Sequence, residues 1–455
     1  MKNIVTVIAE EFINNLVKML TAKGKSFSEL EKQALAESKR TSAKLISAYA
    51  ETLDAAIVAD KTGRREIGYT VQRREDERRL QTLVGEVTFK RTYYKKASGG
   101  YEYLTDIMLG IEQRDRVSGG LGLALAEAAK DMSYEKSSEY VNSDKISRQT
   151  VMERVRRSSV SEQELPEKRQ VPELHIDADE AHVTLYHGKS SEVPLISIYE
   201  GIESNRKRHN CKNVFHISEY GKNPDDLWEQ ALTEIERRYD LSGTKIYLHG
   251  DGGGWIQTGF KWIPDAIFVL DKYHKNKAIN LMTAGLAQKA RKSYEREIRK
   301  ALRAEELKYV DEIAQNLCVQ FPEREGKILP AARYLKRFVK GISICNTDPG
   351  ANNGGCTEPH VSHILAGRLS SRPMAWSVKT LKRLAPILAN GQITLDVKSE
   401  SEPLPVSKAL RKTVAKAGRA FCMGTMGLPH PDSIGRLPVN GKITGTQKLL
   451  HLFAK

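Results

Sequence analysis

The ten residues at 247–256, Tyr-Leu-His-Gly-Asp-Gly-Gly-Gly-Trp-Ile, constrain the fold of this chain more than any other stretch. They predict a short strand at 245–248 that runs into a turn with one acid, Asp251, among glycines. Glycine on both sides of an acid lets a bulky charged ligand approach the backbone closely. Such a turn suits a metal-bound phosphodiester. The alternative interpretation is a tight surface turn in which Asp251 only caps the next segment.

Further acids favour the first interpretation. Asp177 and Asp179 stand two apart in a predicted strand at 174–186, so both side chains face the same side of a sheet. A buried acid needs a partner, and hard oxygen ligands favour Mg²⁺ or Mn²⁺. Glu358 stands at the start of a predicted helix whose early proline suits the first turn. Together with Asp251, these acids predict a carboxylate cluster that holds two divalent ions for phosphoryl transfer.

A second metal interpretation involves Cys356, His360 and His363, because the two histidines are one helical turn apart and the cysteine precedes them closely. A zinc site of this kind lacks a matching second pair of ligands in the sequence. The glycine-rich turn is not a P-loop, since no Gly-Lys-Ser or Gly-Lys-Thr follows it. The chain also has no Gly-x-Ser-x-Gly elbow, which argues against a hydrolase of that type.

The length and the net charge of the chain limit the classes of protein to which it can belong. The chain has 455 residues, enough for two or three domains, and a formal net charge of +15, which favours a polyanionic partner. No apolar run is long enough to span a bilayer and no secretory signal is evident, so we expect a cytoplasmic protein without a membrane partner. The five cysteines are scattered without a Cys-x-x-Cys pair, which argues against a disulfide framework and a zinc ribbon.

The first 165 residues predict a mostly helical DNA-binding region with a small β-hairpin. Residues 1–60 have helical periodicity, with a break near Gly24. Residues 61–115 predict a basic connector, rich in arginine at 61–80, followed by a hairpin with strands at 82–94 and 101–104. In that hairpin, Lys90 and Arg91 stand beside two tyrosines and are candidates to follow a phosphate backbone. Aromatic packing across the strands is the competing interpretation.

Residues 116–165 predict three helical pieces, of which the third, at 146–157, follows a polar turn. Arg148 and Gln149 fall in its first turn, and its last turn is basic. This is the pattern of a helix-turn-helix whose second helix enters the major groove. The predicted DNA-contacting residues of this helix are Arg148, Gln149, Arg154, Arg156 and Arg157. An ordinary helical hairpin with a solvated basic face remains the alternative.

Residues 171–400 change in character and predict a mixed α/β sheet, with strands first and then strands separated by helices. A long charged helical segment, at about 275–340, interrupts this pattern, which we expect to resume near residues 342–345. Residues 401–455 form a basic tail in which Asp432 is the one acid after residue 407.

These motifs, in this order, resemble a known family over nearly the whole chain. Residues 176–183 read Ile-Asp-Ala-Asp-Glu-Ala-His-Val, and residues 270–274 read Leu-Asp-Lys-Tyr-His. Residues 358–363 read Glu-Pro-His-Val-Ser-His, and residues 368–377 read Arg-Leu-Ser-Ser-Arg-Pro-Met-Ala-Trp-Ser. With the turn around Asp251, they resemble the DDE transposases of bacterial insertion sequences, in the Mutator-like group, and most closely the ISLre-two family.

The resemblance implies an α/β fold: an RNase H-like mixed-sheet catalytic core with a helical insertion between the second and third acids. The catalytic triad of the family, which holds the metal, falls on Asp179, Asp251 and Glu358, with Asp177 as an alternative to Asp179. Asp271 and His274 match the Asp/Cys-x-x-His signature that follows the second acid in Mutator-like enzymes, which implies a supporting role. A simple contact at a helix start is the alternative for that pair.

We therefore expect a DNA transposase that uses Mg²⁺ or Mn²⁺, with two ions, to cleave the ends of an insertion sequence and join them to target DNA. Its expected partners are double-stranded DNA, as terminal inverted repeats and target, and further copies of the same chain. Two alternatives stay open. One is a two-metal nuclease or resolvase without strand transfer, and the other is a catalytically inactive DNA-binding protein derived from a transposase.

Overall fold

The computed structural model describes most of the chain before residue 396 and little after it. The described residues are 4–22, 24–142, 146–160, 165, 167–205, 208–395, 412, 415–419 and 421. The chain divides into two compact units. Unit 1 comprises Met1–Leu125, Glu135–Val151 and Leu395–Lys455, and unit 2 comprises Ala126–Tyr134 and Met152–Thr394. The predicted basic tail at 401–455 lies almost entirely outside the described residues.

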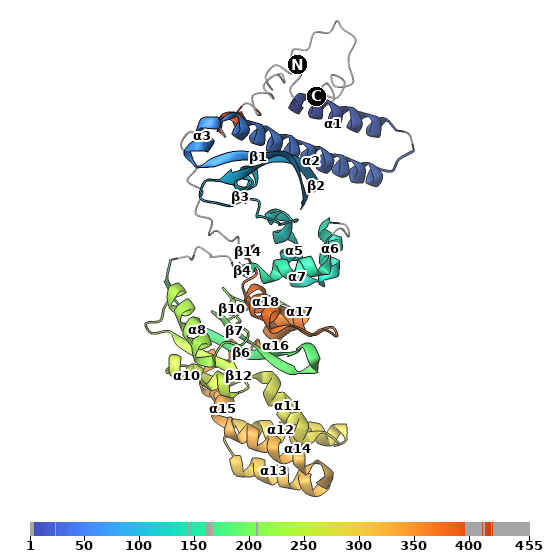
Figure 1. The fold of residues 1–455 in the computed structure, drawn as a ribbon. Coiled ribbons are helices and arrows are strands. Elements are labelled where there is room, and N and C mark those ends of the chain that lie inside the picture. The colour runs from blue at the N-terminus through green and yellow to red at the C-terminus, as the bar shows by residue number, and fades with distance from the viewer. Residues whose placement is uncertain are drawn as a thin grey trace. The chain divides into compact units, whose positions relative to one another are not determined.

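In unit 1, a long helix packs on a twisted hairpin (Figure 1). The helix begins with a capping box, in which the Ser26 side chain and Glu29 satisfy each other's backbone N–H groups. Its buried face joins Leu53 and Ile57 to Tyr69 and Tyr94 of the hairpin. The elements are α1 (Ile4–Thr21), α2 (Phe27–Ala59), α3 (Lys61–Glu66), β1 (Tyr69–Thr82), β2 (Gly85–Lys96), β3 (Tyr101–Glu102) and α4 (Leu104–Met108).

The prediction of a basic connector is wrong from residue 69 onward, because residues 69–82 form β1, which pairs antiparallel with β2. Its arginines misled the sequence interpretation. Most of them are exposed, as expected on a strand with one face in water, while Arg78 is buried and donates to the carbonyl oxygen of Asp115. Residues 101–102 are only a short third strand. The main hairpin therefore lies one strand earlier than predicted.

The three helical pieces predicted at 116–165 are present as α5 (Gly119–Asp131), α6 (Tyr134–Asn142) and α7 (Arg148–Arg156). Ser147 accepts a hydrogen bond from the Thr150 backbone N–H, which is the expected capping contact at the start of α7.

Unit 2 is built on a five-stranded mixed sheet with the order β10-β7-β6-β12-β13. The three strands β6, β12 and β13 are mutually parallel, whereas β7 runs antiparallel to both β6 and β10. Their bounds are β6 (Glu173–Thr184), β7 (Ser190–Tyr199), β10 (Phe215–Ile217), β12 (Lys245–Gly250) and β13 (Ile267–Leu270). The fold is therefore a mixed α/β fold, as predicted.

One face of this sheet is covered by α8 (Pro224–Arg238). Its residues Leu227, Trp228, Ala231 and Ile235 pack against apolar side chains of β6, β7 and β12 in one core. Asn223 caps α8 and Pro224 occupies its first position, both favourable at a helix start. Two short helices, α9 (Gly254–Gln257) and α10 (Gly259–Trp262), follow β12.

The helical insertion predicted at about 275–340 is present and has its own apolar core. The expectation that the α/β pattern resumes near 342–345 is wrong, because these residues lie in α15, where Val339 and Ile342 pack into the same helical core. Helical spacing of the apolar residues, not strand alternation, explains this segment. The helices are α11 (Lys272–Thr283), α12 (Gln288–Arg303), α13 (Leu307–Gln320), α14 (Glu325–Arg337) and α15 (Val339–Thr347).

The chain then returns to the sheet through α16 (Thr357–His360), a π-helical turn at Val361–Ala366 and α17 (Gly367–Leu369), before α18 (Val378–Asn390). Among the described helices, no segment is long and apolar enough to cross a membrane. The remaining strands are short: β4 (Ser158–Val160), β5 (Arg169–Gln170), β8 (Ile202–Asn205), β9 (Arg208–Cys211), β11 (Tyr239–Asp240) and β14 (Ile393–Leu395).

Candidate active site

The two strand-borne acids lie side by side. In the parallel pairing of β6 with β12, His249 is opposite Asp177, so two residues further on Asp251 comes level with Asp179. Asp179 is only 8% exposed. Burial raises the pKa of Asp179 to about 6, and the nearby charges of Glu180 and Asp251 add to that rise. Two carboxylates in this position favour a shared cation or a shared proton.

The glycines around Asp251 are required by the geometry of the turn. A Cβ at Gly250 would lie 2.9 Å from the carbonyl oxygen of Ala178, so glycine lets β12 approach β6 closely. Gly252 has a φ of +81° and faces the Phe338 ring. The Gly253 N–H donates to Asp251 Oδ1 at 2.7 Å. The turn fixes the Asp251 carboxylate at the strand end.

Asp271 and His274 form one unit next to these acids. Asp271 is buried at the start of α11, where its Oδ2 accepts from the backbone N–H groups of Tyr273 and His274 and lies 3.1 Å from His274 Nδ1. That contact raises the pKa of His274, and the charges of Asp179 and Asp251 raise it further. The contact expected between Asp271 and His274 at a helix start is therefore present. It holds the His274 imidazole close to the negative charges of Asp179 and Asp251.

Asp177 has a different environment from Asp179. The Tyr199 hydroxyl donates to it at 3.0 Å, the Cys356 N–H donates to its Oδ2 at 2.9 Å, and His360 Nδ1 lies 3.1 Å from Oδ2. Tyr199 in turn accepts from the Gly355 N–H at 2.9 Å. The Asp177 carboxylate is thus occupied by protein donors. It ties the segment before α16 to β6.

Glu358 is exposed, in the first turn of α16. Within the described part of the chain, its carboxylate has no hydrogen bond or ion pair. Both α16 and the π-helical turn after it contact β6, the strand that carries Asp179. The third predicted acid therefore stands on a helix that packs on the strand of the first acid.

The sequence profile of a family described as "Uncharacterised protein family (UPF0236)" matches residues 20–399. The chain belongs to the UPF0236 family. One UPF0236 protein from Caldanaerobacter subterraneus subsp. tengcongensis is 36% identical over 373 residues, which cover 81% of this chain and 78% of that relative. The narrower resemblance to ISLre-two transposases stays a prediction.

Two more UPF0236 proteins extend the comparison. A second one from C. subterraneus subsp. tengcongensis is 36% identical over 378 residues, covering 82% of this chain and 79% of that relative, and its name joins eleven locus designations. A UPF0236 protein from Streptococcus gallolyticus, named for its position in a vanSb 3′ region, is 26% identical over 373 residues. That alignment covers 78% of this chain and 80% of the relative.

In this UPF0236 protein, the predicted zinc ligands Cys356, His360 and His363 do not all come together. His363 is exposed, whereas His360 Nε2 lies 3.4 Å from the Cys211 thiol of β9, a residue that the sequence did not connect with the site. A hydrogen bond with Cys211 lowers the pKa of the Cys356 thiol to about 7, while that contact raises the pKa of Cys211. The structure thus groups Cys211, Cys356 and His360 and leaves His363 out.

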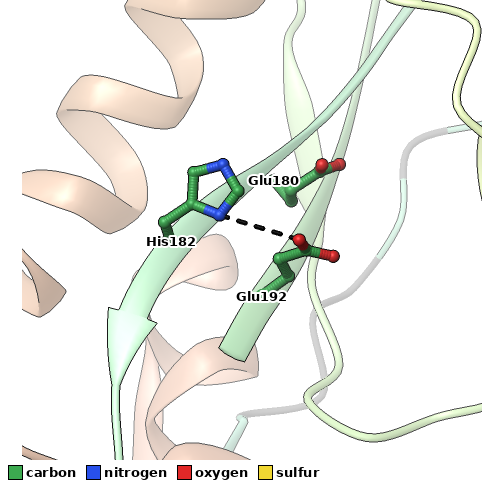
Figure 2. A group of neighbouring side chains, drawn as sticks. All are labelled: Glu180, His182 and Glu192. Carbon is green, nitrogen blue, oxygen red and sulfur yellow. Dashed lines mark ion pairs between the residues drawn. The ribbon is translucent and has the colours of Figure 1, made fainter. Parts of the chain in front are cut away.

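A second group of possible metal ligands lies on the neighbouring part of the sheet (Figure 2). Glu180, His182 and Glu192 each offer one ligand atom, all within 4.8 Å of one another. His182 and Glu192 are opposite each other on β6 and β7 and form a 3.8 Å ion pair, while Glu180 accepts from Trp255 Nε1 at 2.7 Å. Two of the three side chains are mainly exposed. We assign this group no role beyond that pairing.

The predicted DNA-contacting residues divide into available and occupied side chains. Arg148 and Gln149 are exposed, and Lys90 is exposed but its Nζ lies 3.1 Å from Glu75 Oε2. Arg91 is buried against Asp106 and the Tyr103 ring, so the prediction that it follows a phosphate backbone is wrong for this conformation. Arg154 is buried as well, Arg156 donates to Ser377 and Thr380, and Arg157 is half-buried. Basic spacing on a helix did not distinguish surface charge from internal contacts.

Substitution of Asp177 is expected to destabilise the protein. Asp177→Asn replaces one acceptor oxygen with an NH₂ donor among groups that already donate, so buried donors lose their partner. We expect a loss of about 2 to 3 kcal/mol in the free energy of unfolding, measured by urea titration. An unchanged midpoint with an unchanged slope would show that Asp177 does not hold this segment.

Substitution of Asp179, two residues away, is expected to have the opposite effect on metal-free protein. The folded state binds the Asp179 proton more tightly than the unfolded chain, because the pKa rises from 3.8 to about 6 on folding. The resulting penalty is small at pH 4, grows as the pH rises and is complete above about pH 6. Asp179→Asn should therefore stabilise the protein by roughly 3 kcal/mol at pH 7.5 in EDTA and by only about 1 kcal/mol at pH 4.5. A gain that is equal at both pH values would contradict a strained carboxylate.

Proposed function

We propose that the chain is a DDE-type DNA transposase, which hydrolyses a phosphodiester at the end of a mobile element and then joins the freed 3′-hydroxyl to target DNA. One observation carries this proposal. Asp179, within β6, and Asp251, directly after β12, come level in the register of these adjacent parallel strands, and the helix that carries Glu358 packs on β6. An acid on one strand, a second acid just after the neighbouring strand and a third at a helix start support two-metal phosphoryl transfer, which uses carboxylates from converging elements.

The fold supports the same proposal. A central parallel pair carries the first two acids, an antiparallel strand flanks it, and a helical insertion separates the second acid from the third. This is the order of parts in an RNase H-like core of the Mutator-like group. We propose that unit 2 is such a core.

The donor set fits the expected metal. Carboxylate oxygens of Asp179, Asp251 and Glu358 are hard ligands. Burial, with a smaller contribution from Glu180 and Asp251, raises the pKa of Asp179, and a bound divalent cation would offset that cost of its charge. When bound, two Mg²⁺ or Mn²⁺ ions lower the pKa of the attacking water or hydroxyl and stabilise the leaving oxygen. Asp271 orients His274, which becomes cationic more readily beside the two acids and is suited to a phosphate oxygen.

The relatives add an independent argument. One UPF0236 relative bears a name that joins eleven locus designations. A protein sequence repeated at many loci of one genome is the expected product of an element that copies or moves itself. A housekeeping nuclease gives no reason for such repetition.

The test uses the purified chain and labelled duplexes of the two DNA ends that flank its gene. We expect nicking at the element end with Mg²⁺ and none with EDTA, and loss of nicking in Glu358→Gln with DNA binding retained. Joining of the cut end to a second duplex separates a transposase from a nuclease or resolvase. Binding without cleavage under Mg²⁺ or Mn²⁺ would overturn the proposal in favour of an inactive DNA-binding protein.

A further inference from the structure

A cavity of about 350 Å³ lies in unit 2 between β13, α11, α12 and α15, next to the candidate active site. Two lysines of α11, Lys272 and Lys275, and two arginines of α12, Arg299 and Arg303, line it. They converge because residues three or four apart share one face of a helix. The described residues that line this cavity include no aspartate or glutamate. Four cations thus meet around one hollow without an acid.

The electrostatics of Lys275 show that this charge is not neutralised. Burial lowers the pKa of Lys275, and Arg299, Lys272 and Arg303 lower it further, while only the Cys345 thiol acts in the opposite direction. A lysine that pairs with a carboxylate would show the reverse. The cations repel one another, and an anion in the cavity would relieve that repulsion.

Other cations of the same helical insertion are paired with acids. Arg291 Nε donates to Glu295 at 2.9 Å, and Lys336 Nζ lies 2.6 Å from Asp311. In contrast, Arg299 donates to the neutral Asn276 side chain at 2.7 Å, and Lys272 Nζ lies 3.4 Å from the carbonyl oxygen of Gly354. These neutral contacts position the cationic groups without cancelling their charge. A merely solvated basic face does not explain a concave site held in this way.

The cavity lies beside the three segments that carry Asp251, the Asp271–His274 pair and Glu358. His249, which lines it, precedes Asp251 by two residues, and Lys272 directly follows Asp271. Gly355, also in the lining, precedes Glu358 by three residues and is tied to Tyr199. The cavity therefore lies next to segments that carry these acids, and none of the acids lines it.

We propose that this pocket binds a backbone phosphate of the DNA strand whose neighbouring phosphodiester lies at Asp179, Asp251 and Glu358. The inference rests on the proposed function. Arg and Lys donors provide the charge-assisted hydrogen bonds that a phosphate oxyanion accepts, and the two arginines can bind it with paired N–H groups. The pocket would fix the register of the strand across the active site, because phosphate contacts position nucleic acid without reading its sequence.

The test compares two variants of α12 with equal changes in charge. The pocket variant carries Arg299→Gln and Arg303→Gln, which remove two cations from the pocket. The control variant carries Arg296→Gln and Lys300→Gln, which remove two exposed cations of the same helix that do not line the pocket. Affinity for the flanking DNA duplex is measured by fluorescence anisotropy over a series of salt concentrations. For the pocket variant we expect roughly tenfold weaker binding and a plot of log affinity against log salt that is shallower by about 1. Equal losses in both variants would overturn the proposal.

Cys345 lines the same cavity and reports its occupancy directly. The rate at which iodoacetamide alkylates Cys345 is followed by peptide mass spectrometry, with Cys318 of α13, which does not line the cavity, as the internal control. DNA should slow alkylation of Cys345 in the wild type and in Glu358→Gln, and not in the pocket variant. The alkylation rate of Cys345 does not depend on cleavage. It therefore tests phosphate binding in the pocket separately from the proposed transposase reaction.

Free phosphate is the competing source of the anion. If millimolar inorganic phosphate or pyrophosphate slows alkylation of Cys345 and DNA does not, the pocket serves a free anion and the proposal of a DNA contact is wrong. If neither anion changes the rate, the pocket binds no phosphate and the inference is overturned.

Discussion

Asp251→Asn is expected to abolish DNA cleavage and to leave DNA binding intact or stronger. The substitution keeps the shape of the side chain and its contact with the Gly253 N–H, but removes the charge that would hold a divalent ion under the proposed function. Loss of several kcal/mol of charge stabilisation corresponds to a loss of rate on the order of 1,000-fold. DNA affinity should not fall, because a negative charge near the phosphates is removed.

The measurement pairs cleavage of the labelled end duplex with anisotropy of the same duplex. Asp265→Asn is the matched control, since Asp265 is an exposed acid after α10 whose removal changes the net charge equally. The control should cleave as the wild type does. If Asp251→Asn loses DNA binding along with cleavage, Asp251 acts in folding or DNA contact and its catalytic assignment is wrong.

Gly252→Ala is expected to have the second largest effect, on both stability and cleavage. Gly252 has a φ of +81°, and a Cβ there would lie 2.2 Å from the Phe338 ring. The left-handed backbone costs about 1 to 2 kcal/mol for alanine, and overpacking costs about 1 to 3 kcal/mol more. We therefore expect a loss of roughly 3 kcal/mol in the free energy of unfolding, with a displaced Asp251 and reduced cleavage.

Gly254→Ala provides the control two residues away. Gly254 has no left-handed backbone, and nothing lies within 4 Å of its Cβ position. Its substitution should leave thermal unfolding and cleavage close to those of the wild type. If the two alanine variants behave alike, the glycines of this turn serve flexibility in general and not the close packing of Phe338 against Gly252.

The sequence predicted the parts of the site that depend on local pattern. Glycine flanking, strand alternation and the helix-start proline located Asp179, Asp251 and Glu358 on the elements where the structure has them. Alternation also placed Asp177 and Asp179 on one face, but could not separate their roles. Only the structure shows that Tyr199 and Cys356 occupy Asp177, because those contacts join residues far apart in sequence.

The other features that the sequence did not predict also depend on contacts between residues far apart in the sequence. The burial of Arg91 depends on Asp106, and the contact of His360 with Cys211 depends on where the separate β8–β9 pair places Cys211. The pairing of residues 69–82 with β2 depends on a partner strand that outweighs their charged composition. The cationic pocket was missed too, since Lys275 and Arg299 belong to different helices and meet only after folding.

Under the proposed function, the hydrogen bonds from Cys356 to Asp177 and from Gly355 to Tyr199 bear on when a newly made chain completes its set of three acids. Asp179 and Asp251 leave the ribosome well before Glu358, and the helix of Glu358 packs on β6, which is paired with β7 in the folded chain. A nascent or truncated chain that ends before residue 355 thus holds two acids and lacks the third. In a cell that carries such an element, incomplete translation products would leave the chromosome uncut.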